Sequence, residues 1–216
     1  MNKEELKQLR RDYNLSELNR DMLALDPMLQ ITKWLKDAVE VEEEIEANAM
    51  VLSTVGQDGQ PSARVVLLKE VTDQGFVFYT NFNSRKGTEL ADNPKCCATF
   101  WWHRMQRQVR IQGVVDKISE LHAAKYFKSR PIGSQWGAIV SPQSQVIPDR
   151  FYLQDKITNE KNARPNPDDL EKPKHWGGYL IIPTEYEFWQ GRSSRLHDRF
   201  RYRRQNTTWQ IERLAP

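Results

Sequence analysis

Ser84, Arg85 and Lys86 are residues that can bind an anion, and they follow a strand-like run and begin a helical pattern over residues 83–93. A helix N-terminus presents free backbone N–H groups, and basic side chains beside it favour the same negatively charged ligands. An ordinary solvated helix start is the alternative interpretation. The segment therefore predicts a phosphate site where the strand ends and the helix begins.

A second corner rich in basic and hydroxyl groups is expected between two helices. Tyr126 and Arg130 are four residues apart and share one face of a helix predicted over residues 119–130. Pro131 ends that helix, and Ser134 is placed to cap the next one. This corner predicts a second phosphate site, and a helix–turn–helix corner on the surface is the alternative.

The segment Arg64-Val65-Val66-Leu67-Leu68-Lys69 has the pattern of a β-strand with a basic residue at each end. Arg64 and Lys69 are separated by an odd number of positions, so a regular strand places their side chains on opposite faces. A core strand with charged, solvated ends is the alternative interpretation.

An aromatic strand end leads into a loop with several arginines over residues 188–199. Arg195 and His197 alternate, so an extended chain projects both to one side, where they can recognise an anion or an aromatic ring. Nucleic acid is the rival ligand, given the nearby aromatic residues. No pattern of a catalytic nucleophile is present. The spacing of the remaining histidines, His103, His122 and His175, fits no metal site, so no metal is expected.

Short strand patterns separated by turn residues dominate the chain. Strands are expected over residues 49–56, 63–69, 75–80, 95–103, 107–117, 178–183, 185–190, 199–204 and 209–214. Helices are expected over residues 3–13, from Asp26-Pro27 onward, and over 83–93, 119–130, a short stretch near 134, and 148–161. This order predicts a mainly β fold, an antiparallel barrel with peripheral helices.

The composition limits the class of protein further. Hydrophobic residues make up 38% of the 216 residues and charged residues 28%, which indicates a thin core, a barrel, or a core completed by a partner or cofactor. The apolar runs are too short for a membrane helix or a secretory signal. The net charge of +3 does not by itself indicate nucleic acid. Adjacent Cys96 and Cys97 cannot form an ordinary disulfide, so a reducing, cytoplasmic location is expected.

Taken together, these segments resemble the pyridoxamine 5′-phosphate oxidase family of flavin enzymes over nearly the whole chain. The resemblance implies one FMN-binding split-barrel domain over residues 1–216 and a homodimer with active sites at its interface. It also implies oxidation of pyridoxamine 5′-phosphate or pyridoxine 5′-phosphate to pyridoxal 5′-phosphate, with molecular oxygen as acceptor and hydrogen peroxide released. The matching segments are residues 64–69, 78–81, 84–86, 107–109, 125–131, 143–144, 188–191, 195–200 and 213–216.

The resemblance also implies roles for individual residues. FMN contacts are expected at Arg64, Val65, Val66, Leu67, Leu68, Lys69, Tyr79, Thr80, Arg85, Lys86, Gln108, Gln143, Ser144, Trp189 and Arg199. Substrate contacts are expected at Arg10, Arg11, Asp12, Tyr13, Lys69, Tyr126, Arg130, Ser134, Arg195, Leu196 and His197. Arg195 and His197 are the expected catalytic residues facing the pyridine ring, and residues 1–25 are expected to close over the substrate.

Two other classes of function remain as alternatives. One is another split-barrel flavoprotein with a different substrate, which the Tyr126, Arg130 and Ser134 corner argues against. The other is a module that binds nucleic acid or carries FMN without catalysis. The sequence does not distinguish between amine and alcohol as the preferred substrate. It also assigns no role to loop 162–175 and no second product site near Asn19-Arg20.

Overall fold

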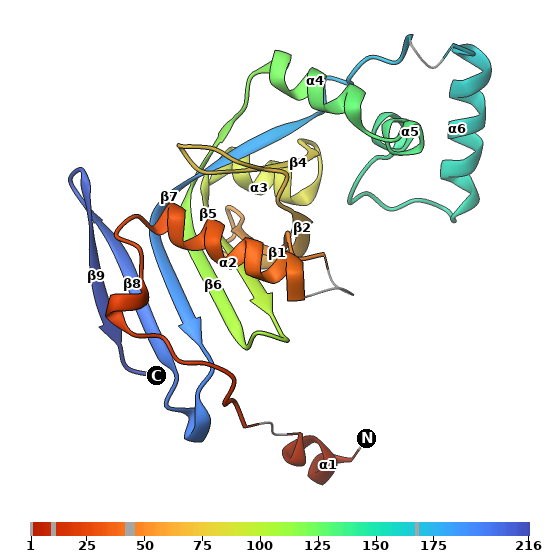
Figure 1. The fold of residues 1–216 in the computed structure, drawn as a ribbon. Coiled ribbons are helices and arrows are strands. Elements are labelled where there is room, and N and C mark those ends of the chain that lie inside the picture. The colour runs from red at the N-terminus through yellow and green to blue at the C-terminus, as the bar shows by residue number, and fades with distance from the viewer. Residues whose placement is uncertain (1, 10–11, 42–45, 167–168) are drawn as a thin grey trace. The chain divides into compact units, whose positions relative to one another are not determined.

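The computed structural model describes residues 2–9, 12–41, 46–166 and 169–216. Arg10 and Arg11, two of the predicted substrate contacts, lie outside these ranges. The α-helices are α1 (Lys3–Gln8), α2 (Pro27–Val41), α3 (Arg85–Asp92), α4 (Glu120–Ser129), α5 (Ile132–Val140) and α6 (Phe151–Ala163) (Figure 1). The strands are β1 (Ala49–Val55), β2 (Pro61–Leu67), β3 (Glu70–Val71), β4 (Phe76–Asn81), β5 (Lys95–Trp102), β6 (Arg107–Lys117), β7 (Trp176–Gln190), β8 (Asp198–Gln205) and β9 (Thr208–Leu214).

The strands form one sheet in the order β2-β1-β5-β6-β7-β4-β3, with β8 pairing with β7 and β9 pairing with β8. Antiparallel pairing joins β3 to β4, β4 to β7, β7 to β8 and β8 to β9. The predicted antiparallel, mainly β fold with peripheral helices is therefore confirmed. In the part of the chain that the structure describes, no helix is both long and apolar enough to cross a membrane.

Strand β7 differs from the prediction, which divided it into two strands around Pro183. Residues 176–181 pair with β4 and residues 185–190 pair with β8. Pro183 lies between these two ladders, so its missing N–H removes no hydrogen bond from either of them. The chain therefore continues as one strand where a break was expected.

The chain divides into two compact units, and each has its own core. The first contains Met1–Leu52, Cys97–Gly113 and Pro183–Pro216. Its core includes the indole of Trp34, which packs edge-on against Phe188 with 5.2 Å between ring centroids. Trp102 is 2% exposed, and its Nε1 donates a hydrogen bond to the Ala47 carbonyl at 2.9 Å. The ring of Trp34, one of the buried residues of α2, also packs edge-on against Trp102 with 6.5 Å between centroids.

The second unit contains Ser53–Cys96 and Val114–Ile182. Every residue of β4 except Tyr79 is buried, and the Phe78 ring stacks on Tyr179 at 5.8 Å between centroids. Ile118 and Tyr79 leave no room for a side chain at Gly178, where a Cβ atom would lie 2.6 Å from the Ile118 Cδ1 atom. This close packing brings Tyr79 against the adjacent β7 backbone.

Candidate functional site

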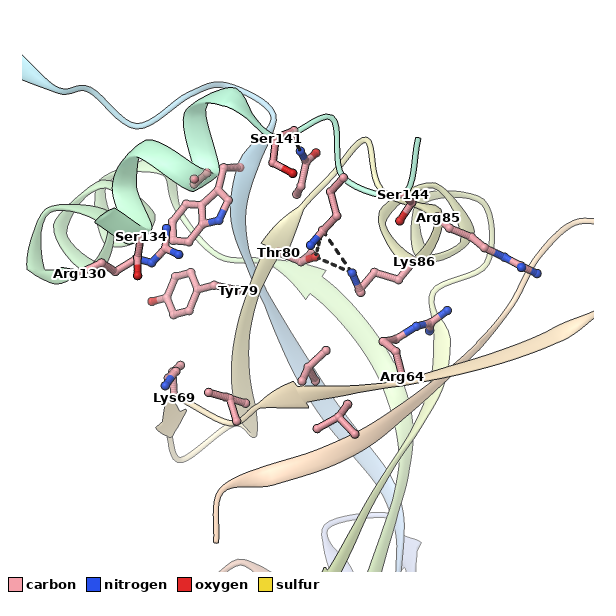
Figure 2. A pocket seen from close by; sticks show the side chains of 18 of the residues that line it. Arg64, Lys69, Tyr79, Thr80, Arg85, Lys86, Arg130, Ser134, Ser141 and Ser144 are labelled. Atoms are coloured by element: carbon pink, nitrogen blue, oxygen red, sulfur yellow. Dashed lines mark hydrogen bonds between the residues drawn. The ribbon is translucent and has the colours of Figure 1, made fainter. Parts of the chain in front are cut away.

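The second unit contains a cavity of about 840 Å³. Many of the predicted cofactor and substrate residues line it, and they come from β2, β4, α3, α4, α5 and nearby loops. Figure 2 shows Arg64, Arg85 and Lys86 at one end and Lys69, Arg130 and Ser134 at the other. The predicted residues in the lining are Arg64, Val65, Val66, Leu67, Lys69, Tyr79, Thr80, Arg85, Lys86, Tyr126, Arg130, Ser134, Gln143 and Ser144.

Helix α3 begins at one end of this cavity, as the sequence predicts. The Ser84 side chain is the N-cap and accepts a hydrogen bond from the backbone N–H of Gly87. Lys86 is buried, and its Nζ atom lies 3.2 Å from Thr80 Oγ1 and 3.3 Å from Gln143 Oε1 (Figure 2). Among the described residues no carboxylate lies within ion-pair distance of this ammonium group, so it presents an uncompensated charge to the cavity.

The environment of Lys86 disfavours its charged form. Burial, followed by the positive charge of Arg64, lowers the pKa of Lys86, and the charge of Glu89 opposes the shift. A phosphate beside Lys86 would supply the missing negative charge and restore the ammonium form. This end of the cavity therefore fits an anionic group.

Arg64 is held at the same end by a buried carboxylate. Its Nη2 atom donates to Glu89 Oε2 at 3.2 Å, and its Nη1 atom donates to Thr54 Oγ1 at 2.5 Å. Glu89 also accepts hydrogen bonds from Thr54, Ser62 and Arg85. Burial alone would raise the pKa of Glu89, but these hydrogen bonds and the charge of Arg64 lower it to about 2. The Glu89 carboxylate therefore stays ionised and holds Arg64 and Arg85, two of the three cations at this end of the cavity.

The other end of the cavity is also cationic. Arg130 is the C-cap of α4, and in the described part of the chain its buried Nη1 atom has no hydrogen-bond partner. Burial lowers the pKa of Arg130, and the nearby phenol group of Tyr126 opposes this shift. A buried donor without an acceptor is unfavourable, so this arginine also fits an anionic ligand.

Lys69 and Arg64 line the same cavity, and Lys69 lies beyond the end of β2 at Leu67, so the alternation of a regular strand does not extend to it. One detail of the predicted geometry is wrong. Ser134 does not cap α5. Pro131 is the N-cap, and the Ser134 backbone N–H donates to the Pro131 carbonyl at 2.8 Å from inside the helix. The Ser134 residue nevertheless lines the cavity.

An aromatic stack forms one wall of the cavity. The Tyr79 ring stacks on Tyr126 at 3.9 Å between centroids and on Trp176 at 5.3 Å. The Tyr79 hydroxyl donates to Glu70 Oε1 at 2.7 Å, and His122 Nε2 lies 2.9 Å from the other carboxylate oxygen. Burial, followed by the hydrogen bond to Glu70, raises the pKa of Tyr79, so its hydroxyl remains a donor.

The first unit contains a smaller cavity of about 470 Å³. Asp12, Tyr13, Arg195 and His197 line it, which brings together four of the predicted substrate residues. The Tyr13 ring lies 5.9 Å from His197 between centroids. Gly191 permits this approach, because a Cβ atom there would lie 2.9 Å from the Tyr13 side chain. The segment around Tyr13 therefore packs against the Arg195 loop.

The backbone around Arg195 is not extended as predicted. Residues Ser193–Arg195 form a 3₁₀ turn, and Ser194 and Arg195 have φ angles of 55° and 60°. Both lie in the left-handed region that non-glycine residues rarely adopt. Arg195 and His197 still line one cavity. The 3₁₀ turn brings them together, whereas the prediction relied on the alternation of side chains in an extended chain.

His197 is held in one tautomer by the backbone. Its Nδ1 atom accepts a hydrogen bond from the Arg192 N–H at 3.1 Å, so Nε2 carries the proton of the neutral ring. Burial, followed by the charges of Arg195 and Arg199, lowers the pKa of His197, and Asp198 opposes the shift. The imidazole is therefore neutral at neutral pH and donates through Nε2.

The structure does not bring five other predicted residues into the lining of either cavity. Arg199 is paired with the buried Glu187, with 2.9 Å between Nη2 and Oε1. The Trp189 ring packs on His197 at 4.6 Å between centroids. Leu68 is buried and Leu196 is 69% exposed. Gln108 lies in β6.

Several lining residues were not predicted from the sequence. They include Ser62, Asn81, Ser141 and Trp176. Asn81 lies inside one of the segments that resemble the family, and its Nδ2 donates to the Ser141 carbonyl at 3.2 Å. Trp176 follows the polar loop 162–175, for which no role was predicted from the sequence. One feature of the sequence could have indicated that this segment is closely packed: two glycines, Gly177 and Gly178, directly follow Trp176, and neither has room for a side chain.

The antiparallel sheet with its peripheral helices places the chain in the split-barrel class. A crystal structure of PhzG from Burkholderia lata in complex with tetrahydrophenazine-1-carboxylic acid is similar, with a TM-score of 0.86 and 29% identity over 95% of this chain and all of that one. A pyridoxamine 5′-phosphate oxidase-related, FMN-binding protein from Nostoc punctiforme shares the fold, with a TM-score of 0.71 at 16% identity, over 90% of this chain and all of that one.

Sequence comparisons define the family within this class. Residues 35–162 match the family model described as pyridoxamine 5′-phosphate oxidase, and residues 176–216 match the pyridoxine 5′-phosphate oxidase C-terminal dimerisation region. The pyridoxine/pyridoxamine 5′-phosphate oxidase of Thermosynechococcus vestitus is 52% identical, over 96% of this chain and 97% of the relative. The relative of that name from Salinibacter ruber is 48% identical, over 98% of this chain and 99% of the relative. The chain belongs to the pyridoxamine 5′-phosphate oxidase family.

Proposed function

We propose that this chain oxidises pyridoxamine 5′-phosphate and pyridoxine 5′-phosphate to pyridoxal 5′-phosphate, with bound FMN as cofactor. In the overall reaction molecular oxygen is reduced to hydrogen peroxide, and the amine substrate also takes up water and releases ammonia. The observation that carries the proposal is the 840 Å³ cavity with a separate cationic group at each end. Two phosphorylated ligands need two such groups.

The cavity residues fit the phosphate of FMN at the α3 end. Lys86 is a buried ammonium group without a carboxylate partner in the described chain, and Arg64 and Arg85 lie beside it (Figure 2). The first turn of α3 adds backbone N–H groups to these cations. Arg64, Thr80, Arg85 and Lys86 would hold the phosphate. When bound, FMN supplies the acceptor for the two electrons that leave the substrate.

The other end fits the phosphate of the substrate. Lys69, Tyr126, Arg130 and Ser134 line it, and Arg130 Nη1 has no acceptor among the described residues. A phosphate that takes no part in the reaction can fix the position of the reacting carbon, and this orientation contributes directly to rate. The four residues therefore orient the substrate and leave the redox chemistry to the cofactor.

Arg195 and His197 complete the site in this proposal by facing the pyridine ring. The neutral imidazole donates through Nε2, which suits the phenolic oxygen of the ring. Tyr13 packs against His197, which supports closure of the N-terminal segment 1–25 over the substrate. Arg195 and His197 fall within the matched dimerisation region, residues 176–216, so we infer a homodimer in which each active site lies at the interface.

The decisive experiment measures turnover of the purified protein. The protein is expected to be yellow from bound flavin and to form pyridoxal 5′-phosphate and hydrogen peroxide from pyridoxamine 5′-phosphate. Unphosphorylated pyridoxamine is the matched control, and its kcat/KM is expected to be lower by on the order of a thousandfold, because phosphate anchoring is lost. A colourless protein that cannot be reconstituted with FMN, or equal turnover of both amines, contradicts the proposal.

A further inference from the structure

Arg130 is held in the cavity without a hydrogen bond or an ion pair from its guanidinium group in the described part of the chain. Its Nη1 atom is buried and has no acceptor. A long side chain that is free to rotate would lose much of its value as a phosphate contact, because ordering it on binding is unfavourable. Another interaction must therefore fix its position before a ligand arrives.

The indole of Trp176 provides this interaction. The Arg130 Cζ atom lies over the Trp176 ring at 4.7 Å from its centroid. A guanidinium group in this position is attracted by the negative face of the ring. Such a contact uses the flat face of the cation and leaves its N–H donors free at the edge.

Trp176 is itself rigidly placed. It is 5% exposed, its ring stacks on Tyr79 at 5.3 Å, and Phe127 packs edge-on against it at 5.4 Å. Its backbone N–H donates to the Pro173 carbonyl at 3.0 Å, and Lys172 Nζ donates to the Trp176 carbonyl at 2.8 Å. Ring and backbone are both fixed, so the indole can act as a platform for Arg130.

The two ends of the cavity use different means to hold their arginines. Arg64 donates to the carboxylate of Glu89, and this contact occupies one of its donors. A carboxylate beside Arg130 would likewise occupy donors and would repel the substrate phosphate. The neutral aromatic face of Trp176 avoids both effects. It holds Arg130 while leaving the N–H donors of the guanidinium available to a phosphate.

We propose that Trp176 is the positioning residue for Arg130, and that it thereby sets the affinity of the enzyme for the phosphate group of its substrate. The inference rests on the proposed function, because it takes Arg130 as the contact for substrate phosphate. Trp176 acts through Arg130 and takes no part in the redox step. Its removal is therefore expected to change KM and to leave kcat largely intact.

The first experiment compares Trp176→Leu and Trp176→Phe, each loaded with FMN and assayed with pyridoxamine 5′-phosphate. Trp176→Leu is expected to raise KM roughly 3- to 30-fold, since it removes the aromatic face. Trp176→Phe keeps an aromatic face and is expected to stay within about threefold of the unmodified enzyme. An unchanged KM in Trp176→Leu overturns the proposal.

A double-mutant cycle with Arg130→Ala separates positioning from a general structural role. Once the guanidinium is absent, Trp176→Leu is expected to raise KM no further. If the indole only supports the fold, Trp176→Leu raises KM by the same factor in both backgrounds, which overturns the proposal. Flavin content measured on each variant confirms that the cofactor site is occupied.

A shape-conserving change keeps the test valid if Trp176→Leu does not fold. Fluorinated tryptophans incorporated at position 176 weaken the negative ring face while preserving its size. KM is expected to rise stepwise with the number of fluorine atoms, and a flat response overturns the proposal. Absence of pyridoxal 5′-phosphate formation by the unmodified protein is a different outcome, because it contradicts the proposed function itself.

Discussion

At the scale of single residues, two cations of the cavity, Lys86 and Arg130, differ from Arg201 and Arg199 in how their charge is balanced. Arg201 is paired with Glu212 at 2.7 Å, and Arg199 is paired with Glu187. Lys86 and Arg130 have no such partner among the described residues, although Lys86 is buried and so is the Nη1 atom of Arg130. Burial of an uncompensated charge destabilises a fold, so the two residues mark where an anionic ligand would stabilise it.

Replacement of Lys86 by methionine tests this interpretation at the cofactor end. Lys86→Met is expected to weaken FMN binding by roughly 10- to 1000-fold, because a charge-assisted contact to phosphate is lost. The same change is expected to maintain or raise the melting temperature of the FMN-free protein, since it removes a desolvated charge. Flavin fluorescence titration and thermal unfolding without FMN measure the two effects.

Lys95→Met is the matched control, because Lys95 is exposed. It is expected to change neither FMN affinity nor stability by a measurable amount. If Lys86→Met lowered the melting temperature and left FMN affinity intact, the role assigned to Lys86 would be wrong.

The acid dependence of stability gives a second test at this scale. The pKa of Glu89 is about 2 in the folded protein, below its ordinary value of 4.5. The stabilisation from its ionised form is therefore complete above about pH 4.5 and is lost as the pH falls toward 2. Glu89→Gln is expected to be about 1–3 kcal/mol less stable at neutral pH, because it loses charged hydrogen bonds.

Urea unfolding at several pH values measures this difference. The gap between the unmodified protein and Glu89→Gln should narrow below about pH 4.5. Glu171→Gln, at an exposed position, serves as control and should show no such narrowing. A gap that stays constant down to pH 3 contradicts the assignment of the low pKa to Glu89.

At the scale of elements, the start of α3 depends on one glycine. A Cβ atom at Gly87 would lie 2.2 Å from the Phe82 carbonyl oxygen. Neither atom can move by side-chain rotation, because the backbone determines the position of each. Side-chain rotation cannot relieve such an overlap, so Gly87→Ala must displace the first turn of the helix. The turn carries Ser84, Arg85 and Lys86, and their convergence would be lost.

Gly87→Ala is therefore expected to lower stability by about 2–4 kcal/mol and to reduce FMN affinity as well. Gly133→Ala is the control, since Gly133 lies in α5 with nothing within 4 Å of its Cβ position. That variant is expected to match or exceed the stability of the unmodified protein. Equal flavin affinity in the two variants would show that the start of α3 is not needed for binding.

Local patterns predicted most elements well, and their failures have local physical causes. Ser84 and Asn93 mark the ends of α3 as expected, because capping depends on adjacent residues. Pro183 was expected to end a strand, but a change of pairing partner at that position accommodates it. Ser134 was expected to cap a helix, but Pro131 begins that helix three residues earlier.

Contacts between distant segments could not be predicted in the same way. The pairing of Arg64 with Glu89 joins β2 to α3, and no periodicity links the two positions. Trp176, which pairs with Asn81 where β7 lies beside β4, contacts Arg130 from a position 46 residues away in the chain. Most cavity residues were identified from the sequence and from the family resemblance. The residues that hold them in place, such as Glu89 and Trp176, could be identified only from the structure.

At the scale of the whole molecule, the predicted substrate residues fall into two groups. Tyr126, Arg130 and Ser134 line the cavity of one compact unit, and Arg195 and His197 line the cavity of the other. The second group lies inside the region matched to dimerisation. We infer that each active site of the proposed homodimer takes the Arg130 group from one subunit and the Arg195 group from its partner.

Mixed dimers test this division of labour directly. Arg130→Ala and Arg195→Ala are each expected to reduce turnover of pyridoxamine 5′-phosphate strongly, and Arg195→Ala is expected to retain FMN. When the two chains are coexpressed, a mixed dimer contains one site with both arginines and one site with neither. Random pairing then restores roughly a quarter of the sites, because half of the dimers are mixed and each has one intact site.

Dual affinity tags allow the mixed dimer to be purified and assayed alone. Its expected activity is about half that of the unmodified dimer per flavin, as follows from one intact site of two. If both arginines came from the same chain, every site in the mixed dimer would carry one substitution and no activity would return. The comparison therefore distinguishes a site shared between subunits from two sites that each belong to a single chain.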